Sequence, residues 1–469
     1  MKDDIKFGTD GWRAIIDKDF IPENIKRVTQ AFADLYPTLK NTGKGVAIGY
    51  DRRRNSKETA EMIANVLVAN NIPVMLSEGF CPTPEVSWMV KNHKLTAGIM
   101  VTASHNPPEW NGIKFKESSG GASSSDYVTK IEKQITLNDE SKREIKESKG
   151  SLDGKIKYYN PYGEYAESIK KLVDIDVIKT LKKHVLIDPL YGSGCGFYPL
   201  MIDDMAEEIH NTADTNFGGL HPEPIPPYVN ELMEKIKKGD YLCGLVTDGD
   251  ADRAGAVDEN GKYVTTHEIY SLLIKHIVEN KGWKGTIIKS ISTTQMLNRL
   301  GKKYNLEVKT VPVGFKYISP AMNEPGVLIG GEESGGFGLP RHIPERDGIL
   351  SGLLLLELMA TNKKPLSQLV AELQKDVGPC YYRRLDLKLS QDDMKKATEH
   401  FKTLSIKEFD GKKVVEHNTM DGHHFLFEDD SWMLFRKSGT EPLVRIYAEG
   451  PTPDKIEKMI AKGKEMLGL

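Results

Sequence analysis

The segment 102–107 (Thr-Ala-Ser-His-Asn-Pro) follows an apolar run and places a serine beside a histidine and an asparagine. If that run is a parallel strand, Ser104 lies at its carboxyl end, where open α/β sheets bind ligands, and is a candidate nucleophile. His105 is a polar neighbour of this candidate nucleophile, and Lys114 adds a second positive group near the same rim. A turn that only terminates the strand is the structural alternative for this segment.

Three carboxylates crowd a second loop, 248–253 (Asp-Gly-Asp-Ala-Asp-Arg), which also follows an apolar run. Asp248, Asp250 and Asp252 repel one another, so their crowding is costly unless a divalent cation compensates it. Ligation by oxygen alone favours Mg²⁺ or Ca²⁺ over zinc. An EF-hand does not fit, because Arg253 occupies the position that requires glycine. A solvated acidic turn is the alternative.

The serine and the aspartate loop point to a joint chemistry. Mg²⁺ held by three carboxylates keeps a local negative charge, so it accepts a further anionic oxygen only with cationic help, for which Arg253 is suitable. A phosphate carried on Ser104 would supply that oxygen. We therefore predict that Ser104 is a phosphoryl carrier and that the metal stabilises charge during transfer.

Two further loops have the composition of a sugar site and a phosphate site. In the glycine-rich loop 330–336, Glu332 and Ser334 could accept hydrogen bonds from vicinal hydroxyls, although a flexible glycine loop is the alternative. The segment 435–442 combines cations, hydroxyls and a glycine, and predicts an anion cradle built from Arg436, Ser438, Gly439 and Thr440, with Arg445 beyond it. It lacks the spacing of a nucleotide P-loop, so the expected ligand is a phosphate ester.

Three loop-like segments are less specific. Arg13, in the N-terminal arm 7–13, could reach a transferring phosphoryl group, although the arm could also be a simple docking turn. Lys316 lies in the segment 313–316 and Arg346 in the segment 342–348, and neither segment indicates a particular chemistry by itself.

The elements that must position these residues alternate as in βαβ folds. Helices are predicted over 22–39, 56–70, 85–92, 267–278, 294–304, 348–361, 391–404 and 453–467, and strands over 46–50, 74–76, 97–101, 184–188, 242–246, 286–289, 380–387, 432–435 and 443–448. The polar segment 118–155 predicts a domain boundary. Three α/β stretches of similar layout indicate an internal duplication, and the last stretch predicts a smaller α+β domain.

Composition limits the class of protein. At roughly 150 residues per domain, 469 residues predict about three domains. The 64 Lys and Arg residues against 67 Asp and Glu residues give a net charge of −3, which argues against nucleic-acid and membrane partners. The four dispersed cysteines predict reduced thiols, and no signal peptide or membrane span is evident, so we expect a cytoplasmic location.

Together and in this order, the motifs resemble those of the α-D-phosphohexomutase family, which contains phosphoglucomutases and phosphomannomutases. The resemblance covers the arm 7–13, the serine loop, the aspartate loop, the loop 331–336 and the loop 436–442, and so extends over nearly the whole chain. It implies three related mixed-sheet α/β domains and a fourth, mobile α+β domain around a central cleft. The expected boundaries are 1–153, 154–262, 263–375 and 376–469.

The resemblance also assigns roles. It makes Ser104 the phosphoserine, whose oxygen joins Asp248, Asp250 and Asp252 around Mg²⁺. It places Arg13, Lys114 and Arg253 around the transferring phosphoryl, and His105 is a further candidate catalytic residue. Glu332 and Ser334 would bind sugar hydroxyls, and the remaining substrate contacts would come from Lys316, Arg346, Arg436, Ser438, Gly439, Thr440 and Arg445. The general acid/base stays open among Lys114, His105 and Arg346, and arginine is a poor proton shuttle.

The implied reaction interconverts α-D-glucose 1-phosphate and glucose 6-phosphate through glucose 1,6-bisphosphate, which also serves as activator. The Gly-Glu-Glu-Ser loop is typical of glucose-preferring enzymes, although Gly336 replaces a histidine found in dual-specificity relatives and Arg346 replaces a lysine found in glucose-specific ones. Phosphomannomutase and phosphoglucosamine mutase remain alternatives, as do a metal-dependent sugar phosphatase and a sugar-phosphate sensor. The expected partner is a hexose phosphate, and the expected assembly is a monomer or homodimer.

Overall fold

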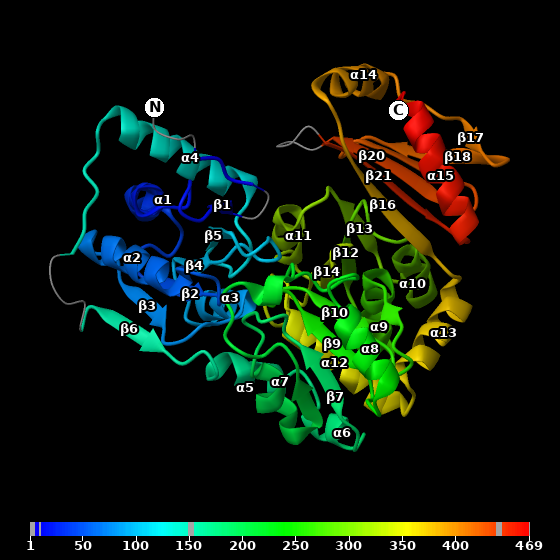
Figure 1. Cartoon of the computed structure of the whole chain (residues 1–469), viewed down its shortest axis with the longest axis horizontal. Coiled ribbons are helices and arrows are strands. Elements are labelled where there is room, and N and C mark those ends of the chain that lie inside the picture. Colours follow the sequence, from blue (N-terminus) through cyan, green and yellow to red (C-terminus); the bar gives the residue numbers. More distant parts are fainter. Residues whose placement is uncertain (1–4, 9–10, 149–153, 438–442, 469) are drawn as a thin grey trace.

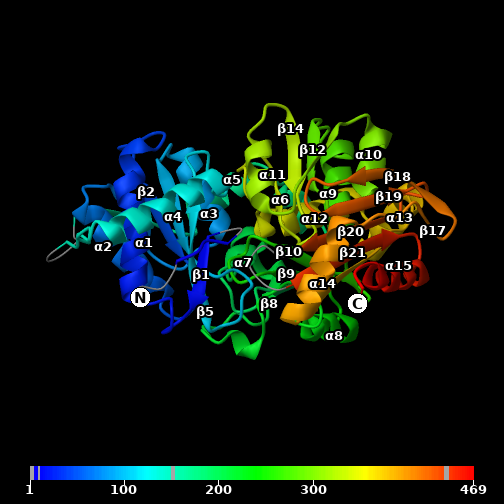
Figure 2. The ribbon, with the colours of Figure 1, turned by 90° about the horizontal axis from the view of Figure 1, so that it is seen from above.

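The computed structural model describes residues 5–8, 11–148, 154–437 and 443–468. Four β-sheets follow one another along these residues, and each carries helices (Figure 1). We call each sheet with its helices a unit. Seen from above, the first unit lies to one side of the other three (Figure 2). Three mixed-sheet α/β units are followed by an α+β unit, so the predicted fold class is confirmed.

The first unit contains strands β1 (Trp12–Ile15), β2 (Val46–Tyr50), β3 (Val74–Ser77), β4 (Ala97–Val101), β5 (Trp110–Lys116) and β6 (Ile156–Tyr159). Its helices are α1 (Pro22–Leu35), α2 (Ser56–Ala69), α3 (Thr83–Asn92) and α4 (Ser125–Glu140), with a 3₁₀ turn at Tyr36–Thr38. The strand order is β1-β5-β4-β2-β3-β6. β5 is antiparallel to both of its neighbours, and the pairs from β4 to β6 are parallel.

The second unit contains strands β7 (Val185–Asp188), β8 (Ala206–Glu208), β9 (Gly244–Thr247), β10 (Ala254–Val257) and β11 (Tyr263–Val264). Its helices are α5 (Glu164–Lys170), α6 (Ile175–Lys179), α7 (Phe197–Ile202) and α8 (Asn230–Lys238), with 3₁₀ turns at Asp203–Met205 and Phe217–Gly219. The strand order is β11-β10-β9-β7-β8.

The third unit contains strands β12 (Thr286–Ser290), β13 (Val308–Val311), β14 (Val327–Gly331) and β15 (Phe337–Gly338). Its helices are α9 (Thr266–Glu279), α10 (Met296–Tyr304), α11 (Phe315–Met322), α12 (Gly348–Asn362) and α13 (Leu366–Val377). The strand order is β13-β12-β14-β15.

The first three units repeat one topology. The orders β5-β4-β2-β3, β10-β9-β7-β8 and β15-β14-β12-β13 correspond strand for strand. In each unit, three parallel strands are followed by one antiparallel strand, and a loop joins that strand to its parallel neighbour. This repetition supports the internal duplication that the sequence only indicates.

The fourth unit is an antiparallel sheet with two helices. Its order is β16-β21-β20-β19-β18-β17. The elements are β16 (Tyr381–Lys388), α14 (Gln391–Lys402), β17 (Glu408–Phe409), β18 (Lys412–Asn418), β19 (His423–Phe427), β20 (Trp432–Lys437), β21 (Leu443–Gly450) and α15 (Pro453–Met466).

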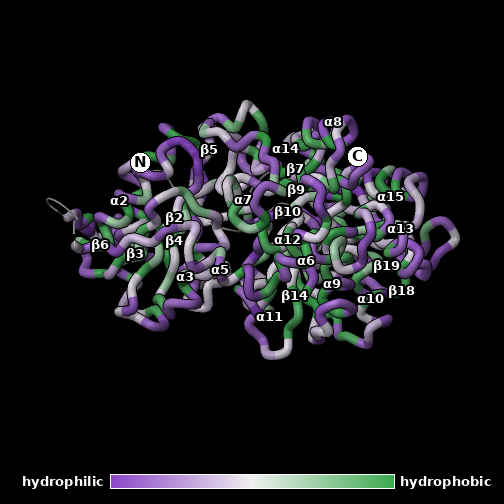
Figure 3. The backbone as a smooth tube through the Cα atoms, turned by 90° about the horizontal axis from the view of Figure 1, so that it is seen from below, coloured by the Kyte–Doolittle hydropathy of each residue, from purple (hydrophilic) through white to green (hydrophobic). Residues whose placement is uncertain are grey.

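The principal core extends across the first three units. On β2, Val46 and Ile48 pack with α1 and α2, whereas Ala47 faces the core shared with the second and third units, as the alternation of a strand requires. The leucine-rich helix α12 is buried on nearly every side between the second and third units, and hydrophobic segments gather towards the interior there (Figure 3). Among the described residues, no helix is long and apolar enough to span a membrane.

The polar segment 118–155 contains regular structure that its sequence does not predict, and the domain boundary expected there stays a prediction. It contains the 16-residue helix α4, which contacts α1 and buries Val128, Ile131 and Ile135, the last two in the core of the first unit. Only these three residues of α4 are buried, so the helix looks polar in sequence. β6 follows this segment and pairs with β3 of the first sheet.

Candidate active site between the first three units

The same loop of the repeated topology carries the candidate residues in each of the first three units. Ser104 lies between β4 and β5, the three aspartates lie between β9 and β10, and Glu332 and Ser334 lie between β14 and β15. Each loop begins at the carboxyl end of a parallel strand, which is where α/β sheets bind ligands.

Ser104 joins the first unit to the second. It is buried and has a φ of 54°, in the left-handed region that non-glycine residues seldom adopt. Its Oγ donates a hydrogen bond to Asp248 Oδ2 at 2.8 Å, and His105 Nδ1 lies 3.5 Å from the same Oγ. Gly249 allows this close approach, because a Cβ there would lie 2.5 Å from the Ser104 carbonyl oxygen.

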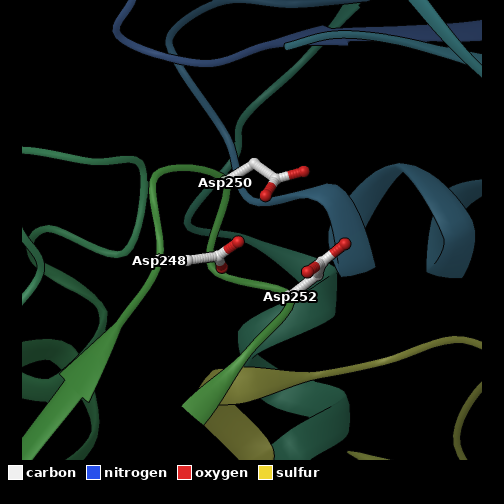
Figure 4. A group of neighbouring side chains, drawn as sticks. All are labelled: Asp248, Asp250 and Asp252. Atoms are coloured by element: carbon white, nitrogen blue, oxygen red, sulfur yellow. The ribbon is translucent and has the colours of Figure 1, made fainter. Parts of the chain in front are cut away.

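Asp248, Asp250 and Asp252 are fully buried and lie around a common space in the loop between β9 and β10 (Figure 4). Each offers a carboxylate oxygen within 4.8 Å of the others. Asp250 Oδ1 and Asp252 Oδ1 are buried without a hydrogen-bond partner, which is unusual for carboxylate oxygens. A donor set made only of oxygens fits Mg²⁺, and the residues that would hold it are these aspartates and an oxygen on Ser104.

The electrostatics of the aspartate loop are those of a crowded anionic site. Burial raises the pKa of Asp248 well above its ordinary value, and the charges of Asp250 and Asp252 raise it further. Burial also acts to raise the pKa of Asp250. The charge and hydrogen bond of Lys114, together with the Thr83 hydrogen bond and the Arg346 charge, outweigh burial and hold that pKa below the ordinary value. Lys114 therefore offsets part of the repulsion that a bound cation would remove.

Four cations surround His105. Burial lowers the pKa of His105 well below its ordinary value, and the positive charges of Arg253, Arg13, Lys114 and Arg53 lower it further. The imidazole is therefore neutral at pH 7. A half-buried, positively charged space that disfavours a protonated histidine favours an anion, such as a phosphoryl group.

The cationic side chains expected around the transferring phosphoryl group come from the first and second units. Lys114 Nζ lies 2.8 Å from Asp250 Oδ2 and 2.9 Å from Asp252 Oδ2. The Arg253 backbone N–H donates to Asp248 Oδ1 at 3.0 Å. Arg13 Nη1 donates to Asn106 Oδ1 at 2.6 Å, so the N-terminal arm contacts the serine loop.

The glycine-rich loop meets the aspartate loop through Arg346. Ser334 Oγ donates to Glu332 Oε1 at 2.8 Å, so the two side chains predicted to bind sugar hydroxyls are paired. Arg346 Nη2 lies 2.9 Å from Asp252 Oδ2, and its Nη1 lies 3.4 Å from Glu332 Oε1. Gly336 makes room for this arginine, since a Cβ at Gly336 would lie 2.2 Å from Arg346 Cδ.

The expected phosphate cradle is described only in part. Ser438, Gly439 and Thr440 lie outside the described residues. Arg436 and Arg445 are cross-strand partners on β20 and β21, which flank that loop. Arg436 Nε donates to Asp421 Oδ2 at 2.9 Å, and the same oxygen accepts the Val313 N–H at 2.9 Å. The fourth unit thereby contacts the segment of the third unit that holds Lys316, which is half-buried at the start of α11.

Sequence reasoning missed several residues that build this site. Thr83 donates a hydrogen bond to Asp250 Oδ2, and Lys116 forms a fully buried ion pair with Glu345 at 2.6 Å, next to Arg346. Arg53 donates to the carbonyl oxygen of Ser104 at 2.6 Å. The alternation of Lys114 and Lys116 on one strand is the only local signal, because the other partners are distant in sequence.

Comparison with known proteins agrees with this architecture. Models of the phosphoglucomutase/phosphomannomutase family match along the chain: alpha/beta/alpha domain I at residues 4–142, domain II at 163–261, domain III at 265–377 and the C-terminal domain at 393–463.

Similar proteins cover the chain from end to end. A "Probable phosphoglucosamine mutase" of Methanosphaera stadtmanae is 32% identical over 98% of both chains, and a "Phosphoglucomutase/phosphomannomutase" of Thermococcus kodakarensis is 29% identical over 98% of both. A solved structure of a candidate phosphomannomutase from Thermus thermophilus is 29% identical, covers 100% of both chains and has a TM-score of 0.86.

The chain therefore belongs to the phosphoglucomutase/phosphomannomutase family, the α-D-phosphohexomutases. These enzymes catalyse phosphoryl transfer within hexose phosphates and depend on Mg²⁺, which agrees with the buried aspartates of this chain. The predictions of a phosphohexomutase and of an enzyme are confirmed.

Proposed function

We propose that this protein is a phosphoglucomutase that interconverts α-D-glucose 1-phosphate and glucose 6-phosphate through glucose 1,6-bisphosphate. The observation that carries the phosphoserine mechanism is the hydrogen bond of 2.8 Å from Ser104 Oγ to Asp248 Oδ2. It sets a buried hydroxyl against the carboxylates that suit Mg²⁺. The glucose preference rests on the sequence Gly-Glu-Glu-Ser of the loop at 331–334.

In the proposed reaction, phosphorylated Ser104 donates its phosphoryl group to the free hydroxyl of the hexose monophosphate. The bond between phosphorus and Oγ breaks, a bond to the sugar oxygen forms, and the hydroxyl proton passes to a base. After the bisphosphate reorients in the site, the bond between its other phosphorus and the sugar oxygen breaks, a bond to Ser104 Oγ forms again, and the released sugar oxygen takes the proton back from the base. Bound Mg²⁺ supplies electrostatic stabilisation of the phosphoryl oxygens.

The surrounding side chains hold the reacting groups. Arg13, Lys114 and Arg253 bind the transferring phosphoryl group, and Glu332 and Ser334 exchange their mutual hydrogen bond for sugar hydroxyls. Arg436 and Arg445, with Lys316, Ser438, Gly439 and Thr440, bind the phosphate that stays on the sugar.

Neutral His105 is the candidate proton acceptor, since its Nδ1 lies 3.5 Å from Ser104 Oγ. Arg346 is unsuitable for that role because a guanidinium stays protonated and is held here by Asp252 and Glu332.

The test is the Ser104→Ala variant, assayed with glucose 1-phosphate and a trace of glucose 1,6-bisphosphate. We expect turnover to fall at least about 1000-fold, because no side chain remains to carry the phosphoryl group. Undiminished turnover would exclude the mechanism. Phosphopeptide mass spectrometry should find phosphate on Ser104 of the wild-type protein, and steady release of inorganic phosphate would instead support a sugar phosphatase.

Phosphoglucosamine mutase is the second candidate, because several relatives of 30–32% identity carry that name. Comparing kcat/KM for the 1-phosphates of glucose, mannose and glucosamine separates the candidates. A preference for glucosamine or mannose would replace the glucose assignment and leave the phosphoserine mechanism in place.

A further inference from the structure

A buried arginine outside the recognised motifs contacts the serine loop along its length. The Arg53 side chain has no exposed surface. Its Nη2 donates to the carbonyl oxygens of Ser104 and Asn106, both at 2.6 Å, and its Nη1 donates to those of Pro107 at 2.8 Å and Trp110 at 3.0 Å. One guanidinium thus bonds three carbonyl groups of the serine loop and that of Trp110, the first residue of β5.

Asp51 holds the arginine and the other side of the serine backbone. Arg53 Nε lies 3.2 Å from Asp51 Oδ2, and that oxygen also accepts a hydrogen bond from Thr102 Oγ1 at 2.6 Å. Thr102 Oγ1 in turn accepts the Ser104 N–H at 2.8 Å. The N–H and the C=O of Ser104 are therefore both tied to Asp51, one through Thr102 and the other through Arg53.

The second unit completes the surroundings of the arginine. The Phe217 ring lies under the guanidinium, 4.8 Å from its central carbon to the ring centroid. Phe217 and the aspartate loop belong to the same unit. The guanidinium therefore contacts the serine loop of the first unit and, through Phe217, the second unit. These two units must stay aligned for Ser104 Oγ to reach Asp248.

This arrangement explains how Ser104 keeps its left-handed backbone. A non-glycine residue with a φ of 54° persists only where the surrounding contacts determine it. The planar, five-donor guanidinium can bond four carbonyls at once, whereas a lysine ammonium has three donors at one point.

We propose that Arg53 is a positioning residue for phosphoryl transfer, which holds Ser104 in the left-handed conformation that directs its Oγ to Asp248. The proposal rests on the proposed function of Ser104. Arg53 acts through the backbone of the loop, so its replacement should impair transfer and leave sugar binding intact.

The test compares Arg53→Lys and Arg53→Ala with Arg54→Lys. Arg54 is the matched control, because it is the next arginine and its exposed side chain pairs with Asp17. We expect kcat of Arg53→Lys to fall roughly 100-fold, the scale expected for an ångström of misplacement, with KM within about threefold of wild type. Added guanidinium chloride at millimolar concentration should raise kcat of Arg53→Ala at least about tenfold, and Arg54→Lys should stay within about twofold of wild type.

A second substitution covers the case in which Arg53→Ala does not fold. Asp51→Asn loosens the same network, so we expect the Asp51→Asn/Arg53→Lys double variant to be no more than about threefold slower than the slower single variant. Additive losses, or an Arg53→Lys variant with kcat within about threefold of wild type, would overturn the proposal. An active Ser104→Ala variant would instead overturn the proposed function, so the two failures are distinguishable.

Discussion

At the scale of single residues, two glycines allow the polar and charged groups of the site to approach one another. Gly249 lets the aspartate loop approach Ser104, and Gly336 lets Arg346 lie between Asp252 and Glu332. Neither need is visible in the loop itself, because the atoms that require the space belong to other segments.

The Gly336→Ala variant tests this role. A Cβ at Gly336 would lie 2.2 Å from Arg346 Cδ, so the arginine must move away from Glu332. We expect kcat/KM to fall about 10- to 100-fold, because misplaced binding groups weaken transition-state stabilisation. Gly79→Ala is the matched control, since its added Cβ would meet only Pro161 at an ordinary 3.5 Å. Equal activity of the two variants would contradict the prediction.

The buried ion pair between Lys116 and Glu345 ties the first unit to the third. Lys116→Met would leave buried Glu345 Oε2 without its cation, while Oε1 keeps Arg346 Nε at 3.3 Å, so we expect the free energy of unfolding to fall by about 3 kcal/mol, the lower end for a broken buried pair. Lys116→Met/Glu345→Gln removes both charges and should recover at least half of that loss. Urea unfolding of both variants measures the effect, and a double variant as unstable as the single one would refute the explanation.

At the scale of elements, one repeated topology positions three different chemistries. The loop that joins a parallel strand to its antiparallel neighbour carries the serine in the first unit, the aspartates in the second and Glu332 with Ser334 in the third. β5 adds Lys114 and Lys116, whose alternate positions place both on one face of the strand. Variation of one loop on a repeated scaffold accounts for the division of roles.

At the same scale, His210 in the segment between β8 and α8 should make the stability of the fold depend on pH. The hydrogen bond to buried Asp188 raises the pKa of His210 above 6.5, and Glu231, whose Oε2 lies 3.2 Å from Nε2, acts in the same direction. A raised pKa means that the folded state binds the proton more tightly, so this contribution to stability is complete below pH 6.5 and is lost as pH rises through the folded pKa.

Thermal unfolding of wild type and His210→Gln between about pH 6 and pH 8.5 measures this contribution. We expect the melting temperature of the wild type to exceed that of the variant most at the acidic end, and the difference to shrink as pH rises. If the melting temperatures of the two proteins change with pH in parallel, His210 does not supply this pH-dependent stability.

At the scale of the whole molecule, the candidate site exists only where the units meet. Asp252 contacts Lys114 of the first unit and Arg346 of the third, and Ser104 reaches Asp248 from the first unit. A cation bound by the aspartates would therefore stabilise the junction as well as the reacting groups.

Removal of the metal tests this expectation. EDTA should abolish mutase activity, and Mg²⁺ at about 100 times its Kd should restore it and stabilise the folded protein by about 2.7 kcal/mol. Asp250→Asn should weaken both the recovery of activity and the stabilisation that Mg²⁺ produces. Full activity in EDTA, with a melting temperature that Mg²⁺ does not change, would contradict the assignment of the site.

The sequence predicts the regular elements well where their pattern is local. The strands at 46–50 and 97–101 have the predicted bounds. The helices predicted at 56–70 and 348–361 differ from α2 and α12 by one residue at one end, and the helix predicted at 267–278 is one residue shorter than α9 at each end. α4 was missed because a helix with three buried residues has a weak apolar periodicity. The roles of Ser438, Gly439 and Thr440 stay predictions.

The sequence by itself determined the family, the order of the units and the loops that carry the serine, the aspartates and the pair predicted to bind sugar, because each motif is a short run of residues with its own chemistry. Only the tertiary structure decided which side chains meet in space. Arg53 with Ser104, Lys116 with Glu345 and Arg346 with Asp252 are separated by 51, 229 and 94 residues in sequence. Such contacts depend on the packing of whole units, which no local spacing encodes.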